Sequence, residues 1–177
     1  MTSPVGRLVL VGDVGPRGLE LRGLYFEGAP HAAGAVPSGA REDAAAFGEV
    51  VAQLRAYFDG ARTSFDVRLA PRGTTFQRAV WRELSAIPYG ETTTYAEIAR
   101  AIGRPRAVRA VGAANGKNPL SIVVPCHRVI GRDGTLTGYA GGIENKRRLL
   151  ELESRRGPHE SAVPQRAFRA APRIGAR

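Results

Sequence analysis

The sequence is poor in the residues that metal centres and disulfide frameworks require. Its 177 residues include three histidines and one cysteine, so an intrachain disulfide is excluded and a zinc cage is not expected. It also lacks a long hydrophobic run, because the apolar stretch near its start, residues 8–11, is too short for a signal peptide or a membrane span. These absences predict a reducing, cytoplasmic setting, with no metal and no membrane.

Acidic residues are scarce as well. The chain carries 26 lysines and arginines against 16 acidic residues, a net charge of +10. From Ser154 to the end there are six arginines and one glutamate, and a second basic stretch has no acidic residue at all. A basic run often only covers a solvated face, but one without counter-charges favours a polyanionic partner. This stretch contains Arg100, Arg104, Arg106, Arg109, Lys117, Arg128 and Arg132.

The first third of the chain has the pattern of a small β-rich unit. Residues 7–11 and 19–26 are strand-like, and a Gly-Pro-Arg-Gly turn separates them. Apolar residues at helical spacing predict a helix over 43–58, and alternation predicts another strand over 64–69. We find no chemistry-bearing motif here. A Pro-Arg-Gly sequence at 71–73 predicts a boundary after residue 72.

From residue 73 the pattern becomes helical. Thr74 with Gln77, and Thr94 with Glu97, form two capping boxes, each of which predicts the start of a helix. A third helix is expected over 105–114. The second and third helices, joined by a short turn that contains glycine, match a helix-turn-helix. The same geometry is common in helix pairs that bind nothing, so the pattern alone fits a DNA-binding motif and a purely structural helix pair equally well.

The single cysteine, Cys126, lies between Pro125 and His127, with Arg128 next. The β-branched run 122–124 predicts a buried strand that Pro125 ends. Positive neighbours lower the pKa of a thiol and a strand end exposes it, as a nucleophilic cysteine requires. A lone cysteine is, however, more often inert packing, and neighbours on an extended chain point opposite ways.

The remaining elements follow in order. Residues 131–134 predict a hairpin turn, and the glycine-rich loop 138–142 would let a backbone lie against a ligand. A last helix is predicted over 143–153. The Arg-, Pro-, Ala- and Gly-rich residues 154–177 have too little hydrophobicity to fold, which predicts a disordered basic tail.

Five stretches resemble motifs of the O6-alkylguanine-DNA alkyltransferases, also called methylated-DNA–protein-cysteine methyltransferases: residues 76–81, 89–92, 109–112, 118–119 and 125–131. The resemblance covers residues 74–153 and is most specific over 125–131, and a weaker match begins at residues 3–6. It implies an α+β fold with a small RNase H-like N-terminal domain of sheet and helix, residues 1–72. A mostly helical, catalytic DNA-binding domain with a helix-turn-helix would span 73–153, followed by the tail, 154–177.

The resemblance also implies a reaction. The substrate would be duplex DNA that contains O6-alkylguanine, with O4-alkylthymine left open, and the nucleotide would be flipped out of the helix. Cys126 would take the alkyl group and keep it, because nothing in such a site cleaves a thioether, so each molecule acts once. No cofactor is implied. We expect a monomer, with cooperative assembly on DNA left open.

Roles of individual residues follow from the same resemblance. Glu153 would orient His127, which would take the proton of Cys126 through a water. Asn118 would brace the turn, Tyr95 would donate to the base, and Arg109 would fill the vacated stack. Further DNA contacts are expected from Thr94, Arg106, Ala107, Ala110 and Lys117, and base-pocket contacts from Arg128, Val129, Tyr139 and Ala140.

Three alternatives are weighed against this reading. A lesion-recognising binding module would lack the cysteine, whereas Cys126 is present. A Cys-His hydrolase would need an oxyanion hole and a histidine that faces the sulfur, and the sequence signals neither. A transcriptional regulator would carry more polar side chains on its recognition helix.

Overall fold

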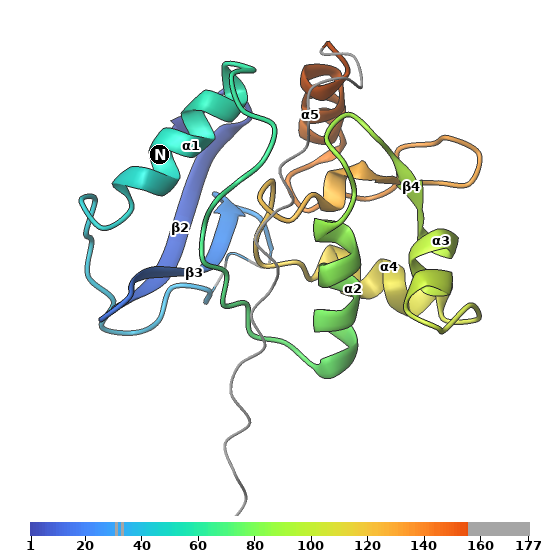
Figure 1. The fold of residues 1–177 in the computed structure, drawn as a ribbon, viewed down its shortest axis with the longest axis horizontal. Coiled ribbons are helices and arrows are strands. Elements are labelled where there is room, and N and C mark those ends of the chain that lie inside the picture. Colours follow the sequence, from blue (N-terminus) through green and yellow to red (C-terminus); the bar gives the residue numbers. More distant parts are fainter. Residues whose placement is uncertain (31, 33, 156–177) are drawn as a thin grey trace, which may run out of the picture.

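The N-terminal part of the chain is an antiparallel sheet with one helix beside it (Figure 1). The computed structural model describes residues 1–30, 32 and 34–155. Strands β1 (Thr2–Ser3), β2 (Gly6–Gly15) and β3 (Gly18–Phe26) pair in chain order, and helix α1 (Gly48–Phe58) follows. The two strands predicted over 7–11 and 19–26 and the turn between them are confirmed, although β2 extends to Gly15. Residues 156–177, which include most of the predicted tail, lie outside the described part of the chain.

Two N-terminal predictions need correction. Helix α1 begins at Gly48 rather than near residue 43. The strand predicted over 64–69 is wrong, because only Leu69 forms a bridge, to Leu21. The alternation of apolar residues there reflects burial, since Phe65 is 5% exposed, and not a ladder of strand pairing.

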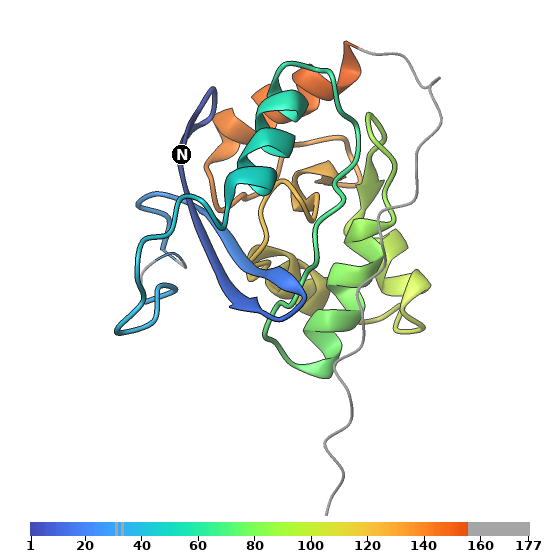
Figure 2. The same cartoon turned by 60° about the vertical axis from the view of Figure 1, so that its left-hand side comes forward.

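The C-terminal part is mainly helical, with α2 (Thr75–Ser85), α3 (Tyr95–Ala101), α4 (Val108–Gly116) and α5 (Ile143–Ser154). Both predicted capping boxes are confirmed, and each satisfies backbone N–H groups that a helix start leaves unpaired. Helix α4 begins at Val108 rather than at Pro105, so the link between α3 and α4 is longer than predicted. Helices α2, α3 and α4 pack against one another (Figures 1 and 2).

The segment between α4 and α5 differs most from the sequence-based expectation. Residues 122–124 are buried but form turns instead of a strand, and Ile122 has φ +70°, a left-handed conformation that a β-branched residue rarely adopts. A 3-10 helix, η1 (Cys126–Arg128), follows. Strand β5 (Val129–Ile130) then pairs in parallel with β4 (Thr93–Thr94). The turn at 131–134 is present, but it therefore does not join a hairpin.

One hydrophobic core joins the two parts of the chain. The backbone of Leu24 in β3 donates to Pro119 and accepts from Ser121, so the N-terminal sheet extends into the segment that leads to η1. In the C-terminal part, Trp81 of α2 donates its indole N–H to the carbonyl of Ala114 in α4, at 2.9 Å. The segment that carries η1 is therefore held by contacts from both the N-terminal sheet and the C-terminal helices. Within the described residues, no helix combines the length and apolar character that a bilayer span requires.

Candidate active site

Cys126 begins η1 and lies in the interior of the protein. Its side chain is 3% exposed, so the expectation of an exposed sulfur at a strand end is wrong. Asn118 holds the turn together: its Nδ2 donates to the carbonyl of Val124 at 2.8 Å and to Sγ of Cys126 at 3.1 Å. Its Oδ1 accepts from the N–H of Leu120 at 3.0 Å. One buried amide thus fixes both the turn and the sulfur.

The surroundings of Cys126 do not lower the pKa of its thiol. Burial raises that pKa to about 11, because a thiolate loses the hydration of water. The hydrogen bond from Asn118 and the charge of Lys146 oppose this effect but do not outweigh it. At neutral pH the sulfur therefore rests as a thiol, and forming the nucleophile requires a group that removes its proton.

His127 follows the cysteine and is completely buried. Its Nε2 lies 2.9 Å from Oε1 of Glu153 on α5. Burial lowers the pKa of the imidazole below its usual 6.5, although Glu153 pulls in the opposite direction. The ring is therefore neutral at pH 7, which is the form that can accept a proton.

Glu153 is a fully buried carboxylate at the centre of this network. Arg128 donates to both of its oxygens, Nε to Oε2 at 2.8 Å and Nη2 to Oε1 at 2.9 Å. Tyr57 of α1 donates its hydroxyl to Oε1 at 2.6 Å. Burial alone would raise the pKa of Glu153, but the hydrogen bonds from His127 and Arg128, together with the charge of Arg128, hold that pKa well below its usual range. The permanent charge of Arg128 is sufficient to keep the carboxylate ionised.

The ionised Glu153 determines the tautomer of His127. A carboxylate only accepts hydrogen bonds, so Nε2 must carry the proton that it donates to Oε1. Nδ1 then bears the lone pair. Nδ1 is buried and has no hydrogen-bond partner among the residues that the structure describes. The arrangement therefore presents a free basic nitrogen in the interior, next along the chain from the sulfur.

Arg128 was predicted to contact the substrate base, and its contacts do not support that role. Besides its bonds to Glu153, its Nη1 donates to the carbonyl of Ile87 at 2.6 Å, and the guanidinium lies over the ring of Tyr89. The side chain is buried. These contacts make Arg128 a structural partner of Glu153 and remove it from the exposed basic surface.

Sequence reasoning missed two residues of this site, Tyr57 and Lys146. Lys146 is fully buried on α5, and its Nζ donates to the carbonyls of Val129, at 2.6 Å, and Thr137, at 3.3 Å. Burial lowers the pKa of its amine. A signal existed, because Lys146, Leu149 and Glu153 share one face of α5 by their spacing, and charges on a buried face require partners.

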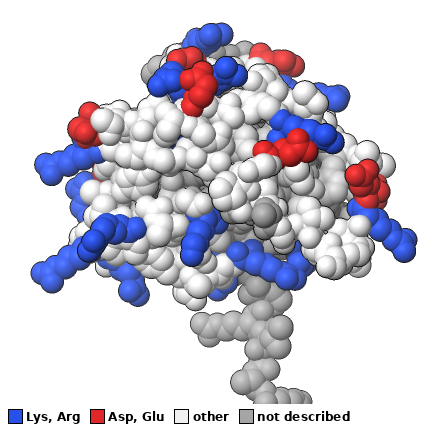
Figure 3. Space-filling model, turned by 180° about the vertical axis from the view of Figure 1, so that it is seen from behind, with Lys and Arg blue, Asp and Glu red and all other residues white. Residues whose placement is uncertain are grey.

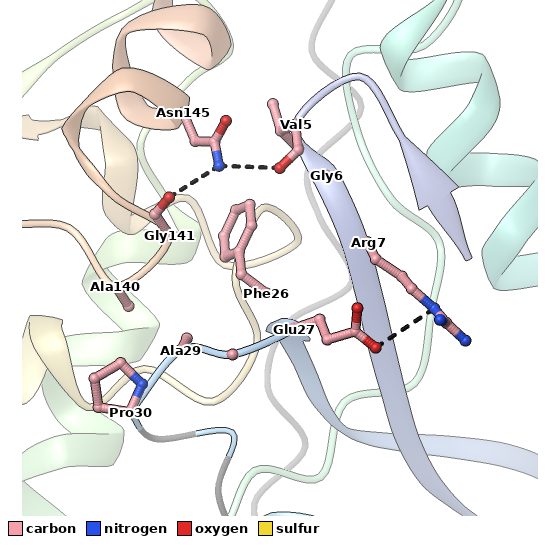
Figure 4. A pocket seen from close by; sticks show the side chains of 11 residues that line it. Val5, Gly6, Arg7, Phe26, Glu27, Ala29, Pro30, Ala140, Gly141 and Asn145 are labelled. Carbon is pink, nitrogen blue, oxygen red and sulfur yellow. Dashed lines mark hydrogen bonds and ion pairs between the residues drawn. The ribbon is translucent and has the colours of Figure 1, made fainter.

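The loop over 137–142 lies between α3, η1 and the N-terminal sheet. Tyr95 of α3 shares a hydrogen bond with the hydroxyl of Thr137, at 2.7 Å between the oxygens. The ring of Tyr139 stands edge-on to His127, with centroids 6.4 Å apart. Ala140 follows and lines a cavity of about 370 Å³ with Gly141 and residues of β2 and β3 (Figure 4). The loop thus brings three predicted site residues, Tyr95, Tyr139 and Ala140, to one region.

The predicted DNA-contacting residues lie away from this buried network. Arg106, Arg109, Ala110 and Lys117 are exposed on and around α4, and Thr94 and Ala107 are partly exposed. Figure 3 shows basic side chains without acidic ones in the lower part of the face behind that of Figure 1. Tyr95 connects the two regions, because its ring lies about 3.8 Å from the position that a Cβ on Gly112 of α4 would occupy.

No group of three or more His, Cys, Asp or Glu side chains that could hold a metal ion occurs in the part of the chain that the structure describes. The donors that chemistry could use are instead one sulfur, one imidazole nitrogen and one carboxylate. Such a set can deprotonate a thiol and form a covalent bond to carbon, which is nucleophilic chemistry.

Comparison with known proteins places both parts of the chain in one family. Residues 75–155 match the family described as 6-O-methylguanine DNA methyltransferase, DNA binding domain, and residues 1–71 match its ribonuclease-like domain. A methylated-DNA–protein-cysteine methyltransferase of Mycobacterium bovis is 54% identical over 156 residues, which cover 88% of this chain and 91% of the relative. Its counterpart in Methanosarcina barkeri is 50% identical over 151 residues, 85% and 92% of the two chains.

A solved structure gives the same result. The crystal structure of Mycobacterium tuberculosis OGT in complex with DNA superposes with a TM-score of 0.80 at 50% sequence identity. The match covers 88% of this chain and 91% of that one. The similarity therefore extends over both the sheet and the helical part.

Proposed function

The chain belongs to the 6-O-methylguanine DNA methyltransferase family, and we propose that Cys126 is the sulfur to which it transfers an alkyl group from O6-alkylguanine in duplex DNA. It is a methyltransferase that repairs DNA by direct reversal. One observation supports the assignment to Cys126 above all: the only cysteine lies next to an imidazole whose free nitrogen is defined by a buried, ionised glutamate.

The chemical step begins with the proton of Cys126. Nδ1 of His127 takes this proton through a water, and Glu153 stabilises the imidazolium that forms. The thiolate attacks the alkyl carbon in line, so that an S–C bond forms as the bond from carbon to O6 breaks. The departing guanine takes a proton by way of Tyr95 and becomes the neutral lactam. The thioether has no route to hydrolysis here, so each molecule reacts once.

The alkyl carbon must leave the base stack to reach a buried sulfur. Flipping a nucleotide costs a few kcal/mol, least for a damaged base. We assign helix α4 to the minor groove, where its small side chains, such as Ala107 and Ala110, permit close approach. Arg109 fills the space that the base leaves, and the exposed Arg106 and Lys117, with the partly exposed Thr94, contact the DNA backbone.

The flipped base lies against the loop over 137–142. Val129 and Ala140 present backbone groups to its edge, and Tyr139 provides an apolar face. In this assignment residues 73–153 form the catalytic DNA-binding domain, and residues 1–72 form a domain that supports it from the other side of the core.

Mass spectrometry tests the transfer directly. After mixing with a duplex that contains one O6-methylguanine, the peptide with Cys126 should carry one methyl group and the DNA an unmodified guanine. A Cys126→Ser variant should bind the duplex and leave the lesion in place. Repair by the serine variant, or wild-type protein that binds the lesion and stays unmodified, would contradict the proposal.

Arg109→Ala tests flipping separately from chemistry. The variant should lose far more activity on duplex DNA than on free O6-methylguanine base, because the free base needs no flipping. Arg100→Ala changes another exposed arginine, on α3, and is the matched control for a lost charge; it should affect the duplex reaction much less. Equal losses on duplex and free base would remove Arg109 from the flipping step.

A further inference from the structure

Asn145, in the first turn of α5, joins the substrate loop to the N-terminal sheet. Its Nδ2 donates two hydrogen bonds, to the carbonyl of Gly141 and to that of Val5, both at 2.9 Å. Figure 4 shows the amide between the two carbonyls, at one edge of the cavity. A primary amide nitrogen has two hydrogens, so the donor capacity of this atom is complete.

The two carbonyls belong to distant parts of the chain. Gly141 ends the loop that holds Tyr139 and Ala140, and Val5, 4% exposed, lies in the turn between β1 and β2. Asn145 therefore bridges two backbone segments that do not follow one another in sequence.

Phe26 of β3 packs against the same loop. Its ring stands edge-on to Tyr139 at 5.6 Å between centroids, and it lies so close to Gly141 that an added Cβ there would be 2.5 Å from a ring carbon. The loop thus packs against the ring of Phe26 and is held in place by the amide of Asn145. The exposed ion pair of Arg7 and Glu27, 3.5 Å apart, borders the same cavity and is worth little by comparison.

We propose that Asn145 is a positioning residue for alkyl transfer, which holds the base-binding loop at the distance from Cys126 that the reaction requires. The inference rests on the proposed function, since it assumes that the loop carries the flipped base. A reactive geometry tolerates little displacement, and a misplacement of about 1 Å can lower a rate by roughly 100-fold. The N-terminal sheet thereby takes part in catalysis without touching the substrate.

Asn145→Asp is the sharpest variant, because it preserves shape and removes both donors. The carboxylate would also oppose two carbonyl oxygens. Its negative charge, however, favours the N-terminus of α5, so the loss of stability is partly offset. Gln53→Glu is the matched control: Gln53 is a buried amide on α1 whose Nε2 donates to the carbonyl of Asp66, at 3.1 Å, and it is not bonded to the loop.

Single-turnover kinetics on an O6-methylguanine duplex separates the roles. For Asn145→Asp the maximal rate of methyl transfer should fall about 10- to 100-fold, while the duplex concentration at half-maximal rate stays unchanged, because α4 is intact. The rate with free O6-methylguanine should fall by a similar factor. Asn145→Gln, which keeps the amide, should recover part of the rate. The methyl-transfer rate of Gln53→Glu should stay within about twofold of the wild-type rate, whatever the change costs in thermal stability.

The possible outcomes are distinct. A wild-type protein that fails to methylate Cys126 overturns the proposed function. A wild-type protein that reacts normally, with Asn145→Asp no slower than Gln53→Glu, overturns only the role of Asn145. A rise in the half-saturating duplex concentration with an unchanged maximal rate would assign Asn145 to DNA binding instead, and would also overturn it.

Discussion

The two ends of the proposed proton relay are built in opposite ways. At the carboxylate end, Glu153 accepts charge-assisted bonds from Arg128 and further bonds from Tyr57 and His127, all buried. At the sulfur end, Cys126 accepts a hydrogen bond from the neutral amide of Asn118, and Nδ1 of His127 has no partner in the described residues. The first end has its hydrogen bonds in place before substrate arrives, whereas the second presents a thiol and a basic nitrogen between which a proton can move.

This difference separates stability from reactivity. A buried ion pair contributes little by its presence, but the loss of one partner leaves an unpaired buried charge. A buried thiol with a raised pKa contributes little to folding and is unreactive until its proton is removed. Four predictions test whether the two ends differ as described.

Glu153→Gln should have the largest effect. Arg128 would keep its buried charge without a counter-charge, so we expect a loss of about 3–5 kcal/mol in the free energy of unfolding. Urea unfolding followed by circular dichroism measures it. Glu144→Gln on the same helix is the control, because its ion pairs with Arg147 and Arg148 are exposed and should contribute under about 1 kcal/mol. Similar losses in both variants would contradict a special role for the buried carboxylate.

The reactivity of the resting thiol should show the next largest effect. A pKa near 11 against the ordinary 9.0 lowers the thiolate fraction about 100-fold at neutral pH. The rate of Cys126 alkylation by iodoacetamide should therefore still rise with pH at about pH 10 in the native protein. In urea the rate should be half-maximal near pH 9 and level off above about pH 10. Because steric burial slows the reaction equally at every pH, the shape of the profile isolates ionisation; a native plateau below pH 9 would refute the raised pKa.

Local signals in the sequence were sufficient to predict much of this structure. The capping boxes at Thr74 and Thr94 are predictable because their partners lie three residues away. Tyr57 lies within the helix predicted over 43–58, but its bond to Glu153 joins residues 96 positions apart, and no pattern at that distance specifies a partner. The parallel pairing of β4 with β5 is non-local in the same way.

The environment of Cys126 was predicted wrongly for a related reason. Sequence neighbours suggested that Arg128 would lower the pKa of the thiol, whereas the guanidinium turns to Glu153 instead. The run before the cysteine has strand propensity, but Ile122 adopts φ +70° because the turn braced by Asn118 overrides that preference. Tertiary contacts determined both results, and contacts of this kind could not be predicted from residues that are adjacent in the sequence.

Tyr57→Phe should lower the free energy of unfolding by about 2 kcal/mol, because it removes one donor from a buried carboxylate. It should also affect catalysis. With one donor fewer, Glu153 becomes more basic and raises the pKa of His127, so that the acid limb of the rate profile for methyl transfer moves to higher pH. Thermal unfolding and single-turnover rates measured from pH 5 to 8 test both. An unchanged profile with lowered stability would make Tyr57 purely structural.

Cys126→Ala should have the smallest effect on stability. The change removes one buried sulfur whose side-chain hydrogen bond, from Asn118 at 3.1 Å, involves no charged group, so the free energy of unfolding should fall by about 1 kcal/mol or less. Asn118→Ala should lower it more, because that amide also holds Val124 and Leu120 and would leave their polar groups unpaired. If the cysteine variant were the less stable of the two, the sulfur itself would be a structural element. The contrast between a carboxylate that stabilises the fold and a sulfur that contributes little to stability would then fail.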